Sequence, residues 1–338
     1  MTPLLAGKDA VAEAARAGEY VRHRPEQTLL YQPLFDALNE LTPSNVSAVQ
    51  RSAHCRRRSR TDSRRNTPIA LEHSSRIPPV MQDFTRQELV QLFDLKYRCN
   101  GTLGSDPARR LRFDYFNPDD YYEALVRRVI TRTTRWLDVG CGRDLFPSNR
   151  SLASELSQRC ALLVGVDPDV TIEENPFVHQ RVRGMVQDLP PDSQFDLVTL
   201  RMVAEHVTDP ADLLATLSRI VVPGGLLVIY TINRWSPVPL VTAFTPFSWH
   251  QPIKHVLWRT EGKDTFPTSY KMNTRRELTQ VCETAGFNEE GFWHLDDCRS
   301  LQRFRLLNIM ELGLRKLLHG FGCRYPENCL LGAYRRRP

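Results

Sequence analysis

From residue 81 onward the chain alternates between two hydrophobic patterns. Short apolar runs, typical of strands buried on both faces, alternate with longer segments whose apolar residues are three and four apart, as in amphipathic helices. The candidate strands are residues 135–139, 161–166, 181–187, 195–200, 226–231, 287–295 and 328–334. The candidate helices are residues 85–97, a helix that begins at Pro118, and residues 274–285 and 301–319. This alternation predicts an α/β fold in which a mainly parallel sheet is covered by helices on both faces.

The last of these helices carries a regular apolar stripe. Leu306, Ile309, Met310, Leu314 and Leu317 recur at helical spacing, so we expect them to share one face.

Residues 1–80 follow neither pattern. The segment 51–65 contains seven arginines and one acid, Asp62, and lacks apolar periodicity, which predicts a largely disordered N-terminal extension. It accounts for the whole net charge of +6, since the rest of the chain carries equal numbers of basic and acidic side chains. No aromatic residue lies among the arginines, so we expect a solvated extension, with Met81 as a natural start, rather than an arm for nucleic acid or anionic membrane.

Length and composition set the broad class. The 338 residues predict one α/β domain over 81–338, with a core at about 110–232 and 274–335 and an insertion at 233–273. No apolar run is long enough to span a bilayer, and the start does not resemble a signal peptide, which together predict a cytoplasmic protein. The eight cysteines form no C-x-x-C pair, so we expect reduced packing residues and no metal site.

The strand ends carry the candidate chemistry. The first strand runs through Asp138 into the turn Gly140-Cys141-Gly142, where glycine allows a tight turn and a close approach of ligand to backbone. Asp167 follows the second strand, at the position where doubly wound folds carry an acid that binds ribose hydroxyls. Asp188 follows the third strand. These side chains predict a nucleotide-containing ligand at the carboxyl edge of the sheet.

These motifs, together with residues 187–190, 195–200, 205–207 and 223–225, resemble class I S-adenosylmethionine-dependent methyltransferases. The small-molecule branch that includes quinone-biosynthesis methyltransferases is the most similar. The resemblance implies a Rossmann-like sheet of seven strands, whose last strand is antiparallel and lies between the fifth and sixth. It also implies S-adenosylmethionine as cofactor and a small-molecule methyl acceptor.

The same resemblance assigns roles to residues by position. Asp138 would hold the methionine ammonium group, Asp167 the ribose hydroxyls and Asp188 the adenine amino group. The remaining cofactor-binding residues that it implies are Gly140, Cys141, Gly142, Pro168, Leu189, Arg201 and Met202.

The acceptor is expected to meet the aromatic-rich insertion at residues 233–273. Trp235, His255 and Trp258 are the candidate acceptor contacts. Methyl transfer requires a base only for a protonated nucleophile, so the catalytic residue stays unassigned. His206, His250 and Tyr270 are the candidates for one.

Three alternatives stay open. A nicotinamide dehydrogenase would require G-x-G-x-x-G, but position 145 is Leu145. The neutral charge outside residues 51–65 argues against a nucleic-acid methyltransferase, though not against one acting on protein. A non-catalytic cofactor-binding protein is the third. The acceptor, the methylated atom and the oligomeric state are not determined by the sequence.

Overall fold

The computed structural model describes residues 77–80, 83–98, 103–236 and 268–338, which all belong to one compact unit, Ala70–Pro338. The expected N-terminal extension, apart from residues 77–80, lies outside the described residues. So does most of the insertion, including His250, His255 and Trp258.

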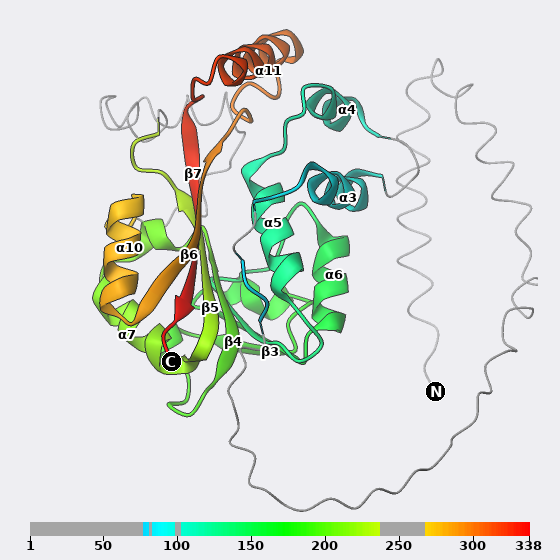
Figure 1. Cartoon of the computed structure of the whole chain (residues 1–338). Coiled ribbons are helices and arrows are strands. Elements are labelled where there is room, and N and C mark those ends of the chain that lie inside the picture. The colour runs from blue at the N-terminus through cyan, green and yellow to red at the C-terminus, as the bar shows by residue number, and fades with distance from the viewer. Residues whose placement is uncertain (1–76, 81–82, 99–102, 237–267) are drawn as a thin grey trace, which may run out of the picture. The chain divides into compact units, whose positions relative to one another are not determined.

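Seven strands form one sheet in the order β3-β2-β1-β4-β5-β7-β6. All neighbouring pairs are parallel except those of β7, which runs antiparallel between β5 and β6 (Figure 1). The strands are β1 (Arg135–Val139), β2 (Leu162–Asp167), β3 (Gln180–Arg183), β4 (Phe195–Arg201), β5 (Val221–Ile232), β6 (Phe287–Asp296) and β7 (Glu327–Arg336). The sheet confirms the predicted doubly wound architecture with an antiparallel last strand.

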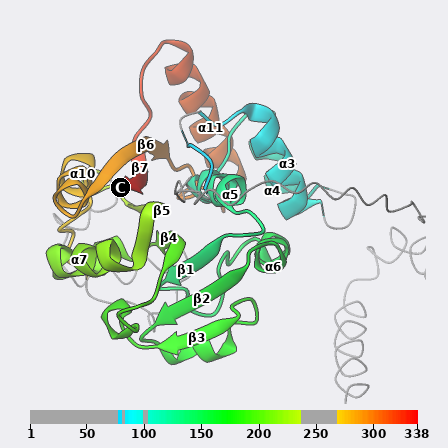
Figure 2. The same ribbon diagram turned by 60° about the horizontal axis from the view of Figure 1, so that its bottom comes forward.

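Helices cover both faces of this sheet (Figures 1 and 2). On one face lie α3 (Arg86–Tyr97), α5 (Pro118–Val129) and α6 (Arg150–Arg159), and on the other lie α7 (Pro210–Ile220) and α10 (Arg275–Thr284). Two further helices, α4 (Ser105–Arg112) and α11 (Arg305–Gly320), complete the described part. The alternating side chains of the strands divide into two cores. Trp136 packs in the first core, under the layer of α3, α5 and α6, and Leu137 packs in the second core, under the layer of α7 and α10.

Helix ends agree closely with the sequence signals. Thr85 and Thr274 accept hydrogen bonds from the backbone of Glu88 and Glu277 at the starts of α3 and α10. Gly286 follows α10 with a φ of +88°, as expected for a glycine at that position.

Two predicted elements differ from the structure. The third strand was expected over residues 181–187, but β3 ends at Arg183 because the carboxylate of Asp188 accepts a hydrogen bond from the Met185 amide and closes a 3-10 turn. The last helix was expected from residue 301 and begins at Arg305, after a tight turn in which the Phe304 amide bonds to the Leu301 carbonyl.

The folded domain includes residues before Met81. Ile77 and Val80 are fully buried in the core under α3 and α5. Arg335 of β7 donates hydrogen bonds to the carbonyls of Ile77 and Pro78, and the Val80 amide donates to Glu290. Within the described residues no helix is long and apolar enough to cross a membrane.

Candidate functional site

The turn after β1 requires glycine. Gly140 and Gly142 have φ values of +70° and +46°, in the left-handed region that other residues rarely adopt. The Gly140 amide donates to the Val166 carbonyl at 2.8 Å, which holds the turn against the end of β2. A Cβ atom on Gly140 would lie 2.3 Å from Cγ2 of Val203, so this position has no room for a side chain.

Asp167 faces this turn from the end of β2. Its Oδ2 accepts a hydrogen bond from the Gly142 amide at 2.9 Å, and its Oδ1 accepts from the Asp169 amide at 2.8 Å. A Cβ atom on Gly142 would meet nothing nearer than Asp167 Oδ2 at 3.9 Å, so there is open space beside the carboxylate. This cradle fits a ligand that brings hydroxyl donors to the carboxylate.

Asp138 lies deeper, near the end of β1. It is 3% exposed, and its Oδ1 accepts a hydrogen bond from Thr199 Oγ1 of β4 at 2.5 Å. Burial raises the pKa of Asp138 from 3.8 to about 7, although the Thr199 hydroxyl and Arg201 both act to lower it. A buried carboxylate of this kind fits a cationic group such as an ammonium.

The structure also brings Asp188 toward Asp167. The Gly184 amide donates to the main-chain carbonyl of Asp167, and a Cβ atom on Gly184 would lie 2.7 Å from Asp188 Oδ2. Leu189, next to Asp188, is buried in the core of the second layer. Pro168 is exposed, whereas Cys141 points inward, with its Sγ against Gly165.

Arg201 and Met202 follow β4 at the same edge. Met202 has a φ of +54°, and its amide donates to the Tyr230 carbonyl of β5 at 2.8 Å. Arg201 lies 4.0 Å from Asp119, whose carboxylate also accepts a hydrogen bond from Arg299 at 2.5 Å. Burial alone would raise the pKa of Asp119, but the guanidinium groups of Arg299 and Arg201 lower it below its ordinary value.

Sequence reasoning missed Asp119 and Arg299. One begins α5 and the other follows β6, 180 residues apart. No local pattern links them, because only the packing of α5 over the carboxyl edge of the sheet brings them together.

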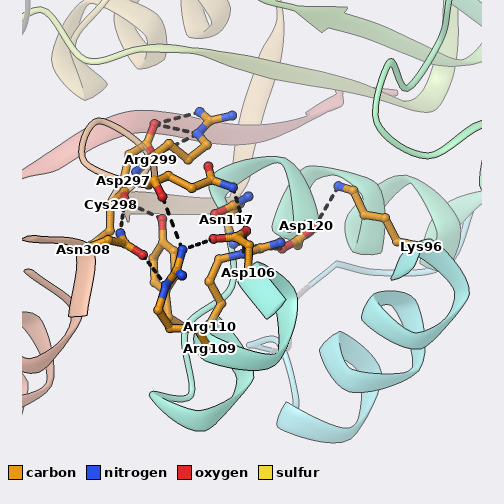
Figure 3. A network of polar contacts seen from close by, with 12 residues as sticks. Lys96, Asp106, Arg109, Arg110, Asn117, Asp120, Asp297, Cys298, Arg299 and Asn308 are labelled. Atoms are coloured by element: carbon orange, nitrogen blue, oxygen red, sulfur yellow. Dashed lines mark hydrogen bonds and ion pairs between the residues drawn. The ribbon is translucent and has the colours of Figure 1, made fainter. Parts of the chain in front are cut away.

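A buried polar network fixes the helices at this edge (Figure 3). Lys96 of α3 donates to Asp120 and Glu123 of α5, both at 2.9 Å, and Glu123 accepts from Asn149 at the start of α6. Burial acts to lower the pKa of Lys96, but the two carboxylates raise it above its ordinary value. Lys96 therefore stays charged, and the three helices are held in one arrangement.

The same network reaches α4 and α11. Arg109 of α4 donates to the Asn308 side chain at 2.8 Å, and Asn308 donates to the Cys298 carbonyl after β6. Figure 3 shows these residues beside Asp297 and Arg299.

The segments that carry two of the candidate bases lie side by side. His206 ends a short 3-10 turn after β4, and the Tyr270 amide donates to the carbonyl of the preceding residue, Glu205, at 3.2 Å. The Glu205 side chain is buried and accepts from Thr231 Oγ1 at 2.7 Å, so it anchors this turn to β5. Trp235 is 67% exposed at the start of the insertion.

The bulky segment after the glycine turn packs into the core. Leu145 and Phe146 are buried in the first core, where Phe146 stacks on Trp136 with ring centroids 6.3 Å apart. Arg143 pairs with Glu174 and Asp144 with Arg150, so these charges are bound to one another beside the turn.

A separate cavity of about 630 Å³ lies beside the outer strand β6. Its walls include Tyr121 of α5, Trp293 and His294 of β6, and Arg315 and His319 of α11. It lies two strands beyond β5, away from the glycine turn. Among the described residues no cluster of three or more potential metal ligands was found.

Comparison with known proteins agrees with this geometry. A family model described as a methyltransferase domain matches residues 108–290, more than half of the chain. Two curated relatives are named ubiquinone biosynthesis O-methyltransferase. The one from Rhodopseudomonas palustris (strain BisB18) is 33% identical over 36% of this chain and 52% of its own length. The one from Pseudomonas paraeruginosa is 34% identical over 29% and 44%. The chain thus spans about half the length, or less, of these relatives.

Among solved structures, an S-adenosylmethionine-dependent methyltransferase from Mesorhizobium loti aligns with a TM-score of 0.38 and 18% identity, over 62% of this chain and 95% of that one. The match of the family model over residues 108–290 shows that this chain belongs to the methyltransferase-domain family.

Proposed function

We propose that this protein transfers a methyl group from S-adenosylmethionine to a small-molecule acceptor. The observation that carries the proposal is the cradle at the carboxyl edge, where Asp167 is fixed by the Gly142 amide and the buried Asp138 lies at the end of the neighbouring strand. In this arrangement Asp167 binds the ribose hydroxyls, Asp138 the methionine ammonium and Asp188 the adenine amino group.

The cofactor supplies an electrophilic methyl group on a sulfonium. The protein has to hold the acceptor in line with that group and exclude water. Arg201 and Met202 line the edge of the site nearest the acceptor in this proposal, and the buried network around Lys96 keeps α5 fixed above them.

We further propose an oxygen acceptor, because the curated relatives are named O-methyltransferases. A hydroxyl acceptor has a proton to lose. His206 and Tyr270, which are joined through Glu205, are the described side chains that we assign to accept or orient it. Nucleic acid is not the proposed acceptor, because the chain outside residues 51–65 carries no net charge.

Calorimetric titration of the whole chain with S-adenosylhomocysteine tests the proposal. We expect Asp167→Ala to weaken binding by about 1.5–3 kcal/mol, roughly 10- to 150-fold, since the charge-assisted hydrogen bonds to ribose are lost. Asp192→Ala, which removes an exposed carboxylate before β4, is the matched control and should bind as the native chain does. Equal affinity of Asp167→Ala and the native chain would refute the assigned site.

A further inference from the structure

Helix α11 exposes an apolar face along its whole length. Its exposed residues form one stripe, the α11 apolar face, in which an adjacent pair at the start is followed by residues at spacings of three and four: Leu306, Leu307, Met310, Leu314, Leu317 and Phe321. Leu306 and Phe321, at its two ends, are each 76% exposed. Four of the five residues of the predicted stripe, all except the half-buried Ile309, therefore share this face, which points away from the core. Scattered exposed apolar residues are ordinary, whereas a continuous stripe on one helix marks an interaction surface.

The opposite side of α11 holds the helix on the domain. Leu312 packs against Tyr115 and Cys298, and Asn308 donates to the Cys298 carbonyl at 3.0 Å. Arg315 pairs with Asp296 at the end of β6 and lies over the Tyr115 ring. Because the inner side is fixed by these contacts, α11 cannot rotate to bury its apolar face without breaking them. Figure 1 shows the helix beyond the ends of β6 and β7.

Cations lie on one flank of α11, between the α11 apolar face and the side that meets the domain. Arg305 and Lys316 are exposed and lie three turns apart, hence on the same flank of the helix. Arg324, which pairs with Glu327 at 3.6 Å, follows the end of the helix with 81% of its side chain exposed. The only acid within α11, Glu311, is turned toward the domain, where it accepts hydrogen bonds from Asn308 and Tyr325. The exposed side of the helix is therefore apolar and cationic.

This charge pattern disfavours a second copy as the occupant. Arg305 and Arg324 lie near opposite ends of the helix, so both parallel and antiparallel pairing of two α11 helices would bring cations close to cations. An anionic lipid surface complements both features, because apolar side chains enter the acyl boundary while arginine and lysine reach the headgroups. We propose that α11 docks this protein on the surface of anionic membranes.

Vesicle co-sedimentation of the whole chain tests this inference. We expect binding to vesicles of phosphatidylglycerol and phosphatidylcholine, with at least tenfold weaker binding to phosphatidylcholine alone and loss of binding at high salt. Met310→Glu/Leu317→Glu should lower the partition coefficient at least tenfold, and Arg305→Glu/Lys316→Glu should lower it by a similar factor.

Matched controls separate α11 from other segments. Met185→Glu changes a methionine of similar exposure, 55% against 69% for Met310, at a site outside α11. Arg132→Glu reverses an exposed charge just before β1, outside α11. Both should bind vesicles within twofold of the native chain. Circular dichroism would show that every variant is folded, as expected for exposed positions.

Three outcomes would overturn the inference. The native chain could fail to bind anionic vesicles. The α11 variants could bind as well as the native chain, in which case another segment, such as the arginine run at 51–65, would be responsible. Light scattering could show that the native chain is a dimer and that Met310→Glu/Leu317→Glu is a monomer, while neither binds vesicles. The α11 apolar face would then be an interface between copies.

Discussion

Asp138 illustrates what burial does to a single carboxyl group. In water its pKa would be near 3.8, but at the end of β1 burial raises that pKa to about 7. At neutral pH the group is therefore close to half protonated, and a bound ammonium would stabilise its ionised form. In the proposed site, binding of the cofactor would thus be coupled to loss of a proton at this residue.

This coupling predicts a pH-dependent affinity. The fraction of ionised Asp138 falls about tenfold between pH 8 and pH 6, so the Kd of S-adenosylhomocysteine should rise by about the same factor. Titration calorimetry at several pH values measures this. Asp138→Asn should bind weakly and without this pH dependence, whereas a flat profile in the native chain would show that Asp138 does not meet the ammonium group.

The same pKa has a consequence for stability. A carboxyl group whose pKa is higher in the folded state stabilises the fold only while it is protonated, so its contribution decreases as the pH rises from about 4 to beyond 7. Asp138→Asn should accordingly raise the Tm at pH 8, by about 2–4 °C for each kcal/mol recovered, and have little effect near pH 4.

At the scale of elements, the turn after β1 depends on one close contact. Gly140 has a positive φ, and a Cβ atom there would overlap Val203 Cγ2, which belongs to the segment after β4. The turn therefore sets the distance between β1 and the segment after β4, and with it the floor of the proposed cofactor site.

We expect Gly140→Ala to destabilise the protein by at least about 1–2 kcal/mol from backbone strain, and further from the overlap with Val203. Urea unfolding measures the loss. The double variant Gly140→Ala/Val203→Ala removes the overlap and should be more stable than the single variant Gly140→Ala. Gly320→Ala, where a Cβ atom meets nothing within 4 Å, is the control and should be nearly neutral. If Gly140→Ala were equally neutral, the close contact would be unimportant.

At the scale of the whole molecule, the domain extends upstream of Met81. Ile77 and Val80 fill the first core, and Arg335 and Glu290 hold their backbone against the outer strands. Residues 77–80 are thus bound to the last two strands, β6 and β7.

Removal of residues 1–80 should therefore destabilise the domain. Loss of the buried side chains of Ile77 and Val80 should lower the free energy of unfolding by about 1.5–3 kcal/mol for each side chain. A chain that begins at Ala70 retains both and is the control for a chain that begins at Met81. Urea unfolding of the two compares their free energies, and equal values would show that residues 77–80 contribute nothing.

The sequence by itself determined the order of the strands along the chain, the glycine turn and the acids at the strand ends. These are local signals, since strand periodicity, Gly140 and Asp167 each lie within or next to the element that they define. It also predicted the place of β7, through the resemblance to a family. The apolar stripe on α11 was equally legible from its spacing.

Only the tertiary structure decided which side of that stripe meets solvent. Leu306 and Met310 are exposed because Asn308, Leu312 and Arg315 bind the domain instead. It also paired Asp119 with Arg299 and Lys96 with Glu123. Such contacts join residues far apart in the chain, and they depend on how helices pack over the sheet edge, which no local pattern encodes.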